Sequence, residues 1–165
     1  MDKLSTTVDT LIVNLVESYH RGGANGINGK LIPSRESIIT ILRTLQSLLF
    51  PGFYEEEPIN ESTIKSITGQ RLFFVYRRLA EAIEKGICHD CQESGTCQSH
   101  ETCRTRAHTI SMLLLEQLPG IREMLLKDVD ALFEGDPAAK SRSEIILAYP
   151  GLAAISAYRI AHVLY

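Results

Sequence analysis

The spacing of the apolar residues is the feature that most constrains the fold, because it repeats every three or four positions over almost the whole chain. Leu4, Val8, Leu11 and Leu15 follow this spacing near the start, and later segments repeat it. Apolar residues at this spacing fall on one face of an α-helix. No segment shows the sustained apolar-polar alternation that is typical of half-buried strands. The sequence therefore predicts an all-α fold.

Turn-forming residues divide this pattern into separate helices. One helix is predicted from residue 35 to Pro51, and another from residue 64 to about Gly86. Pro119 is predicted to separate two further helices, since proline disrupts a helix interior. With two shorter helices near the C-terminus, we expect a multi-helix domain of about six to eight helices.

The C-terminal region carries the clearest helix signals. Ser141 and Glu144 match a capping box, so a short helix is predicted from there to about Tyr149. Pro150 suits the first turn of a second helix, which meets the first at an angle. That helix reaches Tyr165 with an apolar last turn and no stop signal. Two interpretations remain open: the chain is a fragment cut where it packs against something else, or the helix docks in its own core.

Composition argues against two classes of partner. The chain has 165 residues, of which 44% are hydrophobic, and a formal net charge of −3. Its basic residues are interspersed with acidic ones, so we expect no binding to nucleic acid or to an anionic membrane. The longest apolar stretch is broken by Pro150 and is shorter than the about 18 residues of a membrane span. The N-terminus has no signal-peptide pattern, so we expect a cytoplasmic protein.

Four cysteines and a histidine lie close together in the sequence. Cys88 and Cys91 form a C-x-x-C pair, and Cys97, His100 and Cys103 follow within twelve residues. Thiolates and an imidazole at this spacing are candidate ligands of a zinc ion, whose role would be structural rather than catalytic. The alternatives are reduced thiols in an exposed loop, or a disulfide. No other cofactor is predicted.

Asp136 is the one carboxylate for which the sequence predicts a fixed position. It stands between Gly135, which allows close approach of a ligand, and Pro137, which restricts the backbone. The alternative is an ordinary turn or helix-cap aspartate. The chain has no convincing nucleophile–base pair of its own, so no catalytic residue is assigned within it.

Residues 128–165 combine three short motifs in one register. These are Asp-Pro-Ala at 136–138, Tyr-Pro-Gly at 149–151 and Tyr-Arg-Ile-Ala-His at 158–162. The stretch resembles the segment of bacterial serine O-acetyltransferases that directly precedes their left-handed parallel β-helix. The close resemblance covers about a quarter of the chain. The preceding helices are similar to the helical N-terminal domain of that family only in general character.

This resemblance implies transfer of an acetyl group from acetyl-CoA, a cosubstrate, to the hydroxyl of L-serine in cysteine biosynthesis. In the family, the β-helix holds the catalytic His–Asp pair and the CoA cleft, and neither is present in these residues. Asp136 is implied to bind the amino group of serine, and the inhibitor L-cysteine takes the same place. Such a fixed carboxylate aims the serine hydroxyl through a charge-assisted hydrogen bond.

The resemblance also implies a domain organisation and partners. Residues 1–134 would form the helical oligomerisation domain of a hexamer, a dimer of trimers, and residues 135–165 would begin the catalytic region with a truncated connector helix. The chain alone is expected to be inactive, and the complete enzyme to bind O-acetylserine sulfhydrylase. Two alternatives remain: a helical self-association module, or a metal- or redox-responsive module built on the cysteine cluster.

Overall fold

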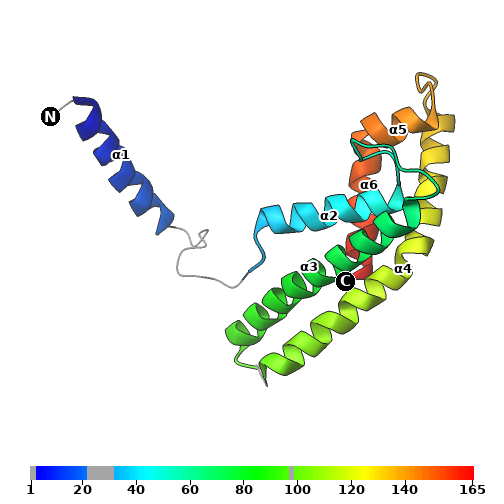
Figure 1. Cartoon of the computed structure of the whole chain (residues 1–165). Coiled ribbons are helices and arrows are strands. Elements are labelled where there is room, and N and C mark those ends of the chain that lie inside the picture. The colour runs from blue at the N-terminus through cyan, green and yellow to red at the C-terminus, as the bar shows by residue number, and fades with distance from the viewer. Residues whose placement is uncertain (1–2, 22–31, 97–98) are drawn as a thin grey trace. The chain divides into compact units, whose positions relative to one another are not determined.

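The computed structural model describes residues 3–21, 32–96 and 99–165. Over these residues it contains six α-helices and no strand, so the prediction of an all-α fold is confirmed. The helices are α1 (Lys3–Tyr19), α2 (Arg35–Leu49), α3 (Ile64–Ser94), α4 (His100–Gly135), α5 (Arg142–Ala148) and α6 (Pro150–Val163) (Figure 1).

The chain divides into two compact units, Met1–Leu31 and Ile32–Tyr165. In the first unit, α1 carries the predicted stripe of apolar residues, including Leu11 and Leu15. The second unit contains α2 to α6 and all of the residues discussed below.

Local signals in the sequence set the two ends of α2. The Ser34 hydroxyl accepts a hydrogen bond from the Ser37 N–H at 3.2 Å, which satisfies one of the free donors at the helix start. After the helix, the chain turns at Gly52, whose φ of 86° is a left-handed conformation that suits glycine. Both boundaries lie where the sequence predicts them.

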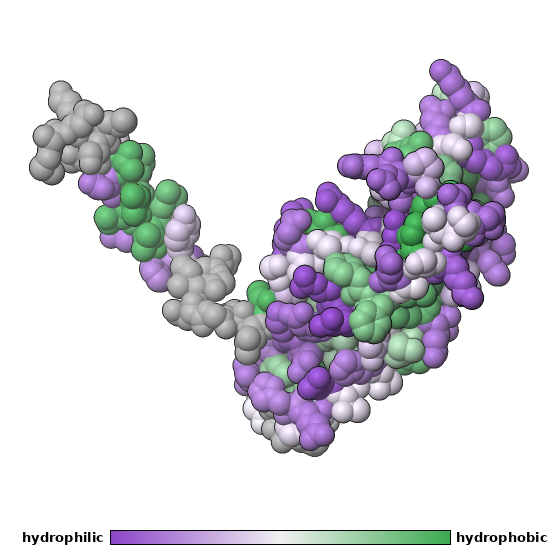
Figure 2. Space-filling model, viewed as in Figure 1, coloured by the Kyte–Doolittle hydropathy of each residue, from purple (hydrophilic) through white to green (hydrophobic). Residues whose placement is uncertain are grey.

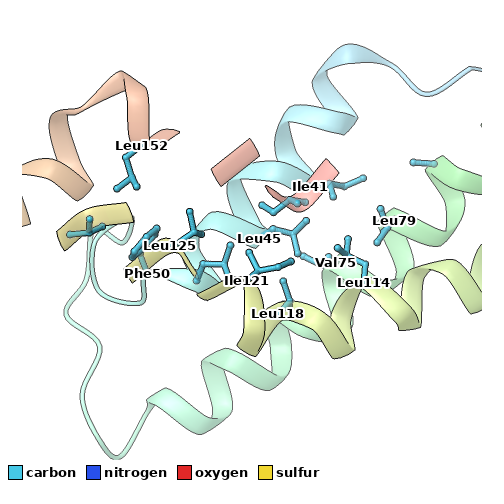
Figure 3. Packing of buried hydrophobic residues seen from close by; sticks show 14 of the residues in the cluster. Ile41, Leu45, Phe50, Val75, Leu79, Leu114, Leu118, Ile121, Leu125 and Leu152 are labelled. Atoms are coloured by element: carbon cyan, nitrogen blue, oxygen red, sulfur yellow. The ribbon is translucent and has the colours of Figure 1, made fainter. Parts of the chain in front are cut away.

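One hydrophobic core joins the five helices of the second unit. In Figure 3, Leu45 of α2, Val75 of α3 and Ile121 of α4 lie close to one another in this core. Burial of a side chain of this size contributes about 1.5–3 kcal/mol to stability. The large side chains that are less than 2% exposed include Leu45, Leu49, Leu114, Ile121, Leu125, Ile145 and Leu152.

The predicted end of the second long helix near Gly86 is wrong. Gly86 lies inside α3, which continues to Ser94 and ends at Gly95, with a φ of 67°. A glycine inside a helix costs about 1 kcal/mol relative to alanine. Cys88 is buried beyond Gly86, so α3 keeps packing against α4, and this packing outweighs the cost.

The predicted break at Pro119 is also wrong, because α4 passes through this proline as one helix. Leu114, Leu118, Ile121 and Leu125 are all buried at helical spacing, on both sides of the proline. Burial of these four side chains exceeds the about 3 kcal/mol that a proline costs in a helix interior. Figure 1 shows that α4 bends along its length, as proline-containing helices do.

The two predicted C-terminal helices are confirmed as α5 and α6. Both pack against α4, and they contact each other. Val163 packs against the core, whereas Leu164 and Tyr165 are exposed. The structure groups residues 135–165 in one unit with the preceding helices. The functional division after residue 134 stays a prediction.

Hydrophilic residues cover most of the face of the second unit that Figure 2 shows, with smaller apolar areas between them. Of the helices that the structure describes, none has the length and apolar character needed to cross a membrane.

Candidate functional site

Asp136 lies directly after α4, where the helix ends. Its N–H donates to the carbonyl of Leu132 at 3.1 Å, which closes the last turn. Pro137 follows, and because proline has no N–H it cannot continue the helical hydrogen bonding. The carbonyl of Asp136 then accepts from the Ala139 N–H at 3.0 Å. Asp136 is therefore fixed to the end of a helix by a tight turn.

Two hydrogen bonds hold the Asp136 carboxylate. The Ala138 N–H donates to Oδ1 at 2.9 Å, and the Tyr149 hydroxyl donates to Oδ2 at 2.7 Å. The residue is half-buried. A carboxylate has about four acceptor positions, so one donor on each oxygen leaves capacity for a ligand. The group is thus oriented and still able to accept further hydrogen bonds.

The charge states at this site are well defined. The hydrogen bond from Tyr149, followed by that from the Ala138 N–H, lowers the pKa of Asp136 below its ordinary value. The same bond to Asp136 is the main reason that the pKa of Tyr149 is raised to about 12. At neutral pH Asp136 is an anion and Tyr149 is a neutral donor. The arrangement is suited to a cationic ligand group.

Sequence reasoning missed Tyr149, although local signals set its position. The Ser141 hydroxyl accepts from the Glu144 N–H at 3.1 Å, and Glu144 Oε2 accepts from the Lys140 N–H at 2.8 Å. This cap starts α5, and Pro150 begins α6, so Tyr149 lies at the junction of two short helices. A tyrosine directly before Pro-Gly, at the end of a capped helix, was the signal that could have found it.

Gly135 lies directly before Asp136, and its predicted role in supporting the bend stays a prediction. Gly135 is the last residue of α4, with no positive φ. A Cβ atom added there would meet nothing within 4 Å. Among the described residues, neither the backbone conformation nor a close neighbour requires glycine at this position.

An ion pair and a buried hydrogen bond hold α6 against α4 and α2, next to this site. Arg159 of α6 donates from Nε and Nη2 to the two carboxylate oxygens of Asp128 on α4, at 2.7 and 2.8 Å. The side chains are only 27% and 21% exposed, which favours a firm bidentate pair. Gln46 of α2 donates to the Ser156 hydroxyl at 2.6 Å in the buried interior. Because α6 follows Tyr149 directly, the ion pair and the hydrogen bond also restrict the position of Tyr149.

The residues of the cysteine cluster lie at the other end of α4 from Asp136. Cys88 and Cys91 are in α3, and His100 and Cys103 are in the first turns of α4. Cys97 lies outside the described residues. Cys88 and Cys103 are buried, so the alternative of thiols in an exposed loop is wrong for these two. The three described cysteines have free thiols.

Comparisons with known proteins address the family that the sequence resembles. No family model matches the chain. The plasmid serine acetyltransferase of Synechococcus elongatus is 35% identical over 135 residues, which cover 81% of this chain and 42% of that protein. The serine acetyltransferase of Bacillus subtilis is 60% identical over 42 residues, or 26% of this chain and 19% of that protein. The chain is homologous to the serine acetyltransferases.

Two solved serine acetyltransferases are similar in fold to this chain. Serine acetyltransferase 1 of Entamoeba histolytica, in complex with L-cysteine, superposes with a TM-score of 0.58 at 25% identity and covers 99% of this chain. Isoform 3 from that organism, in complex with cysteine, gives a TM-score of 0.59 at 27% identity over 98% of this chain. This chain spans about half of each of these two proteins, 54% and 51%. The predicted relationship to this family is confirmed.

Proposed function

We propose that this chain is the N-terminal part of a serine O-acetyltransferase, in which Asp136 binds the amino group of L-serine. The observation that carries the proposal is the Asp136 carboxylate, which is ionised at neutral pH and held on both oxygens by Tyr149 and the Ala138 N–H. Homology to serine acetyltransferases over 81% of the chain supports it.

The proposed role of Asp136 is to position the substrate. The ammonium group of serine donates to the free acceptor positions of the carboxylate, which forms a charge-assisted hydrogen bond. This contact fixes the amino acid at one end, so that its hydroxyl points toward a base. We propose that the base and the acetyl-CoA cleft lie outside residues 1–165, as in the family that the sequence resembles. Acetyl-CoA is then a cosubstrate, and catalysis requires no further cofactor.

L-Cysteine is proposed to compete for the same carboxylate. L-Cysteine carries the same α-amino and α-carboxyl groups as L-serine, so a site that binds the amino group accepts either molecule. Two structural neighbours of this chain are complexes with cysteine, which supports the proposal. Feedback inhibition would follow directly from this competition.

We further propose that the helical region drives self-association, in the complete enzyme to a hexamer. Phe73 and Phe74 of α3 are 65% and 40% exposed, and they line a groove of about 720 Å³ with Arg77 and His108. Exposed aromatic residues beside arginine are typical of protein interfaces. The complete enzyme is also proposed to be cytoplasmic and to bind O-acetylserine sulfhydrylase.

The test is acetyl transfer from acetyl-CoA to L-serine, followed by release of the CoA thiol. It compares the complete product of the gene with residues 1–165 alone. We expect O-acetylserine to form only with the complete product, because the base lies outside this chain. Activity of residues 1–165 alone would contradict the placement of the base. Inactivity of both would contradict the proposed reaction and leave self-association as the function of these helices.

A further inference from the structure

One end of the α3–α4 pair carries a group of sulfur and nitrogen side chains that the proposed acetyl transfer does not use. The two helices lie side by side (Figure 1). Cys88 and Cys91 are three residues apart near the end of α3, and His100 and Cys103 are three residues apart at the start of α4. Residues at this spacing share one face of a helix, so each helix supplies a pair of side chains.

The two pairs meet between the helices. Sγ of Cys88 lies 3.7 Å from Nδ1 of His100. The thiol of Cys103 lies near enough to the thiols of Cys88 and Cys91 to interact with both. Cys88 and Cys103 are each only 4% exposed, and Cys91 is half-buried. The three cysteines and His100 therefore lie near one another between the helices, and Cys88 and Cys103 are buried there.

We propose that Cys88, Cys91, His100 and Cys103 bind a zinc ion that joins the end of α3 to the start of α4. Structural zinc sites take four cysteine and histidine ligands in a tetrahedron, with bonds of about 2.3 Å to sulfur and 2.0 Å to nitrogen. Tetrahedral bonds of these lengths place a sulfur and a nitrogen ligand about 3.5 Å apart. The distance between Cys88 and His100 is close to this value, at 3.7 Å.

Zinc binding requires a local rearrangement of the side chains. Within residues 3–21, 32–96 and 99–165, no three histidine, cysteine or acidic side chains stand in an arrangement that could already hold a metal ion. The thiols must lose their protons and turn from one another toward a common centre. Zinc drives this step itself, because its binding displaces thiol protons. The helices supply the correct four side chains, and the metal sets their final orientation.

The burial of Cys88 and Cys103 keeps solvent and substrates away from the proposed ligands. Four protein ligands leave no open position on the metal, so the proposed role is structural.

Metal content tests the proposal without reference to acetyl transfer. The complete gene product is purified without a histidine tag and without chelators, and its zinc is measured by mass spectrometry. We expect about one zinc ion per chain. Replacement of the metal by Co²⁺ should give the intense visible and near-ultraviolet absorption of a tetrahedral thiolate site. Removal of zinc by a chelator should lower the melting temperature.

Three serine variants decide which side chains are the ligands. C88S and C103S, which change only one atom, should each lose the zinc and the Co²⁺ absorption. Cys97 is not part of the proposed site, so C97S is the matched control and should keep both. Zinc-free wild-type protein that also fails to bind Co²⁺ would overturn the proposal. So would loss of zinc in C97S alone, or a disulfide of Cys103 in the purified protein.

Discussion

At the scale of the residue, Tyr149 is the side chain that orients the Asp136 carboxylate. Its hydroxyl is 2.7 Å from Oδ2, and the only other donor that the structure gives this carboxylate among the described residues is a backbone N–H. Tyr149 is therefore a positioning residue for the proposed serine contact. Its effect should be visible both in the titration of Asp136 and in the use of serine.

Y149F removes this hydroxyl and keeps the ring. We expect the Michaelis constant for serine to rise about three- to tenfold in the complete gene product, as for the loss of one hydrogen bond, with little change for acetyl-CoA. The pKa of Asp136, followed by NMR, should rise. Y158F is the matched control, because Tyr158 is 66% exposed and stacks on His162. An unchanged Asp136 pKa in Y149F would contradict the assigned role.

The same bond predicts how stability depends on pH. The lowered pKa of Asp136 means that its contribution is complete above its unfolded pKa and is lost as the pH falls through the folded value. The raised pKa of Tyr149 means that its contribution is complete below pH 10 and is lost as the pH rises through about 12. The stability difference between the wild type and Y149F should therefore be largest near neutrality. Urea unfolding at several pH values measures it, and a pH-independent difference would contradict the account.

At the scale of the element, Pro119 is the point where local preference and tertiary packing conflict. P119A restores a backbone hydrogen bond in the middle of α4 and removes a steric clash. We expect the free energy of unfolding to increase by about 1–3 kcal/mol. Thermal or urea unfolding of the two proteins provides the comparison. A lower stability of P119A would show instead that the bend at this proline is needed for packing.

Local signals explain which elements could be predicted from sequence. Ser141 forms the helix cap that its sequence context predicts, and Ser34 caps α2 in the same way, because both partners of each cap are within four residues. Gly86 and Pro119 misled the prediction, since the energy that keeps α3 and α4 intact comes from contacts with other helices. Contacts between helices join residues that are far apart in the sequence, so a short segment of sequence does not predict them.

The same distinction applies to the candidate sites. The position of Asp136 after a helix and before a proline could be predicted, because adjacent residues define it. Its partner Tyr149 is thirteen residues away, and only the return of the chain through α5 brings the two together. The pairing of Cys88 with His100 likewise depends on how α3 and α4 pack. The candidate residues could therefore be named from the sequence, but not the contacts among them.

At the scale of the whole molecule, the exposed aromatic residues of α3 are the proposed self-association surface. F73E places a charge in this surface, where the side chain is 65% exposed and makes little contribution to the core. We expect a smaller molar mass of the complete gene product in light scattering, with an unchanged circular dichroism spectrum. Y158E introduces the same charge at a position that is 66% exposed and should leave the mass unchanged. An unchanged mass of F73E would contradict this surface.

The most direct test of the central claim is the serine dependence of acetyl transfer by D136N in the complete gene product. The account predicts a rise of about 10- to 100-fold in the Michaelis constant for serine, as for the loss of a charge-assisted hydrogen bond, and weaker inhibition by L-cysteine. The Michaelis constant for acetyl-CoA should stay the same. D130N, which removes an equal charge from a half-exposed carboxylate of α4, should behave like the wild type. Unchanged serine kinetics in D136N would show that this carboxylate does not bind the substrate.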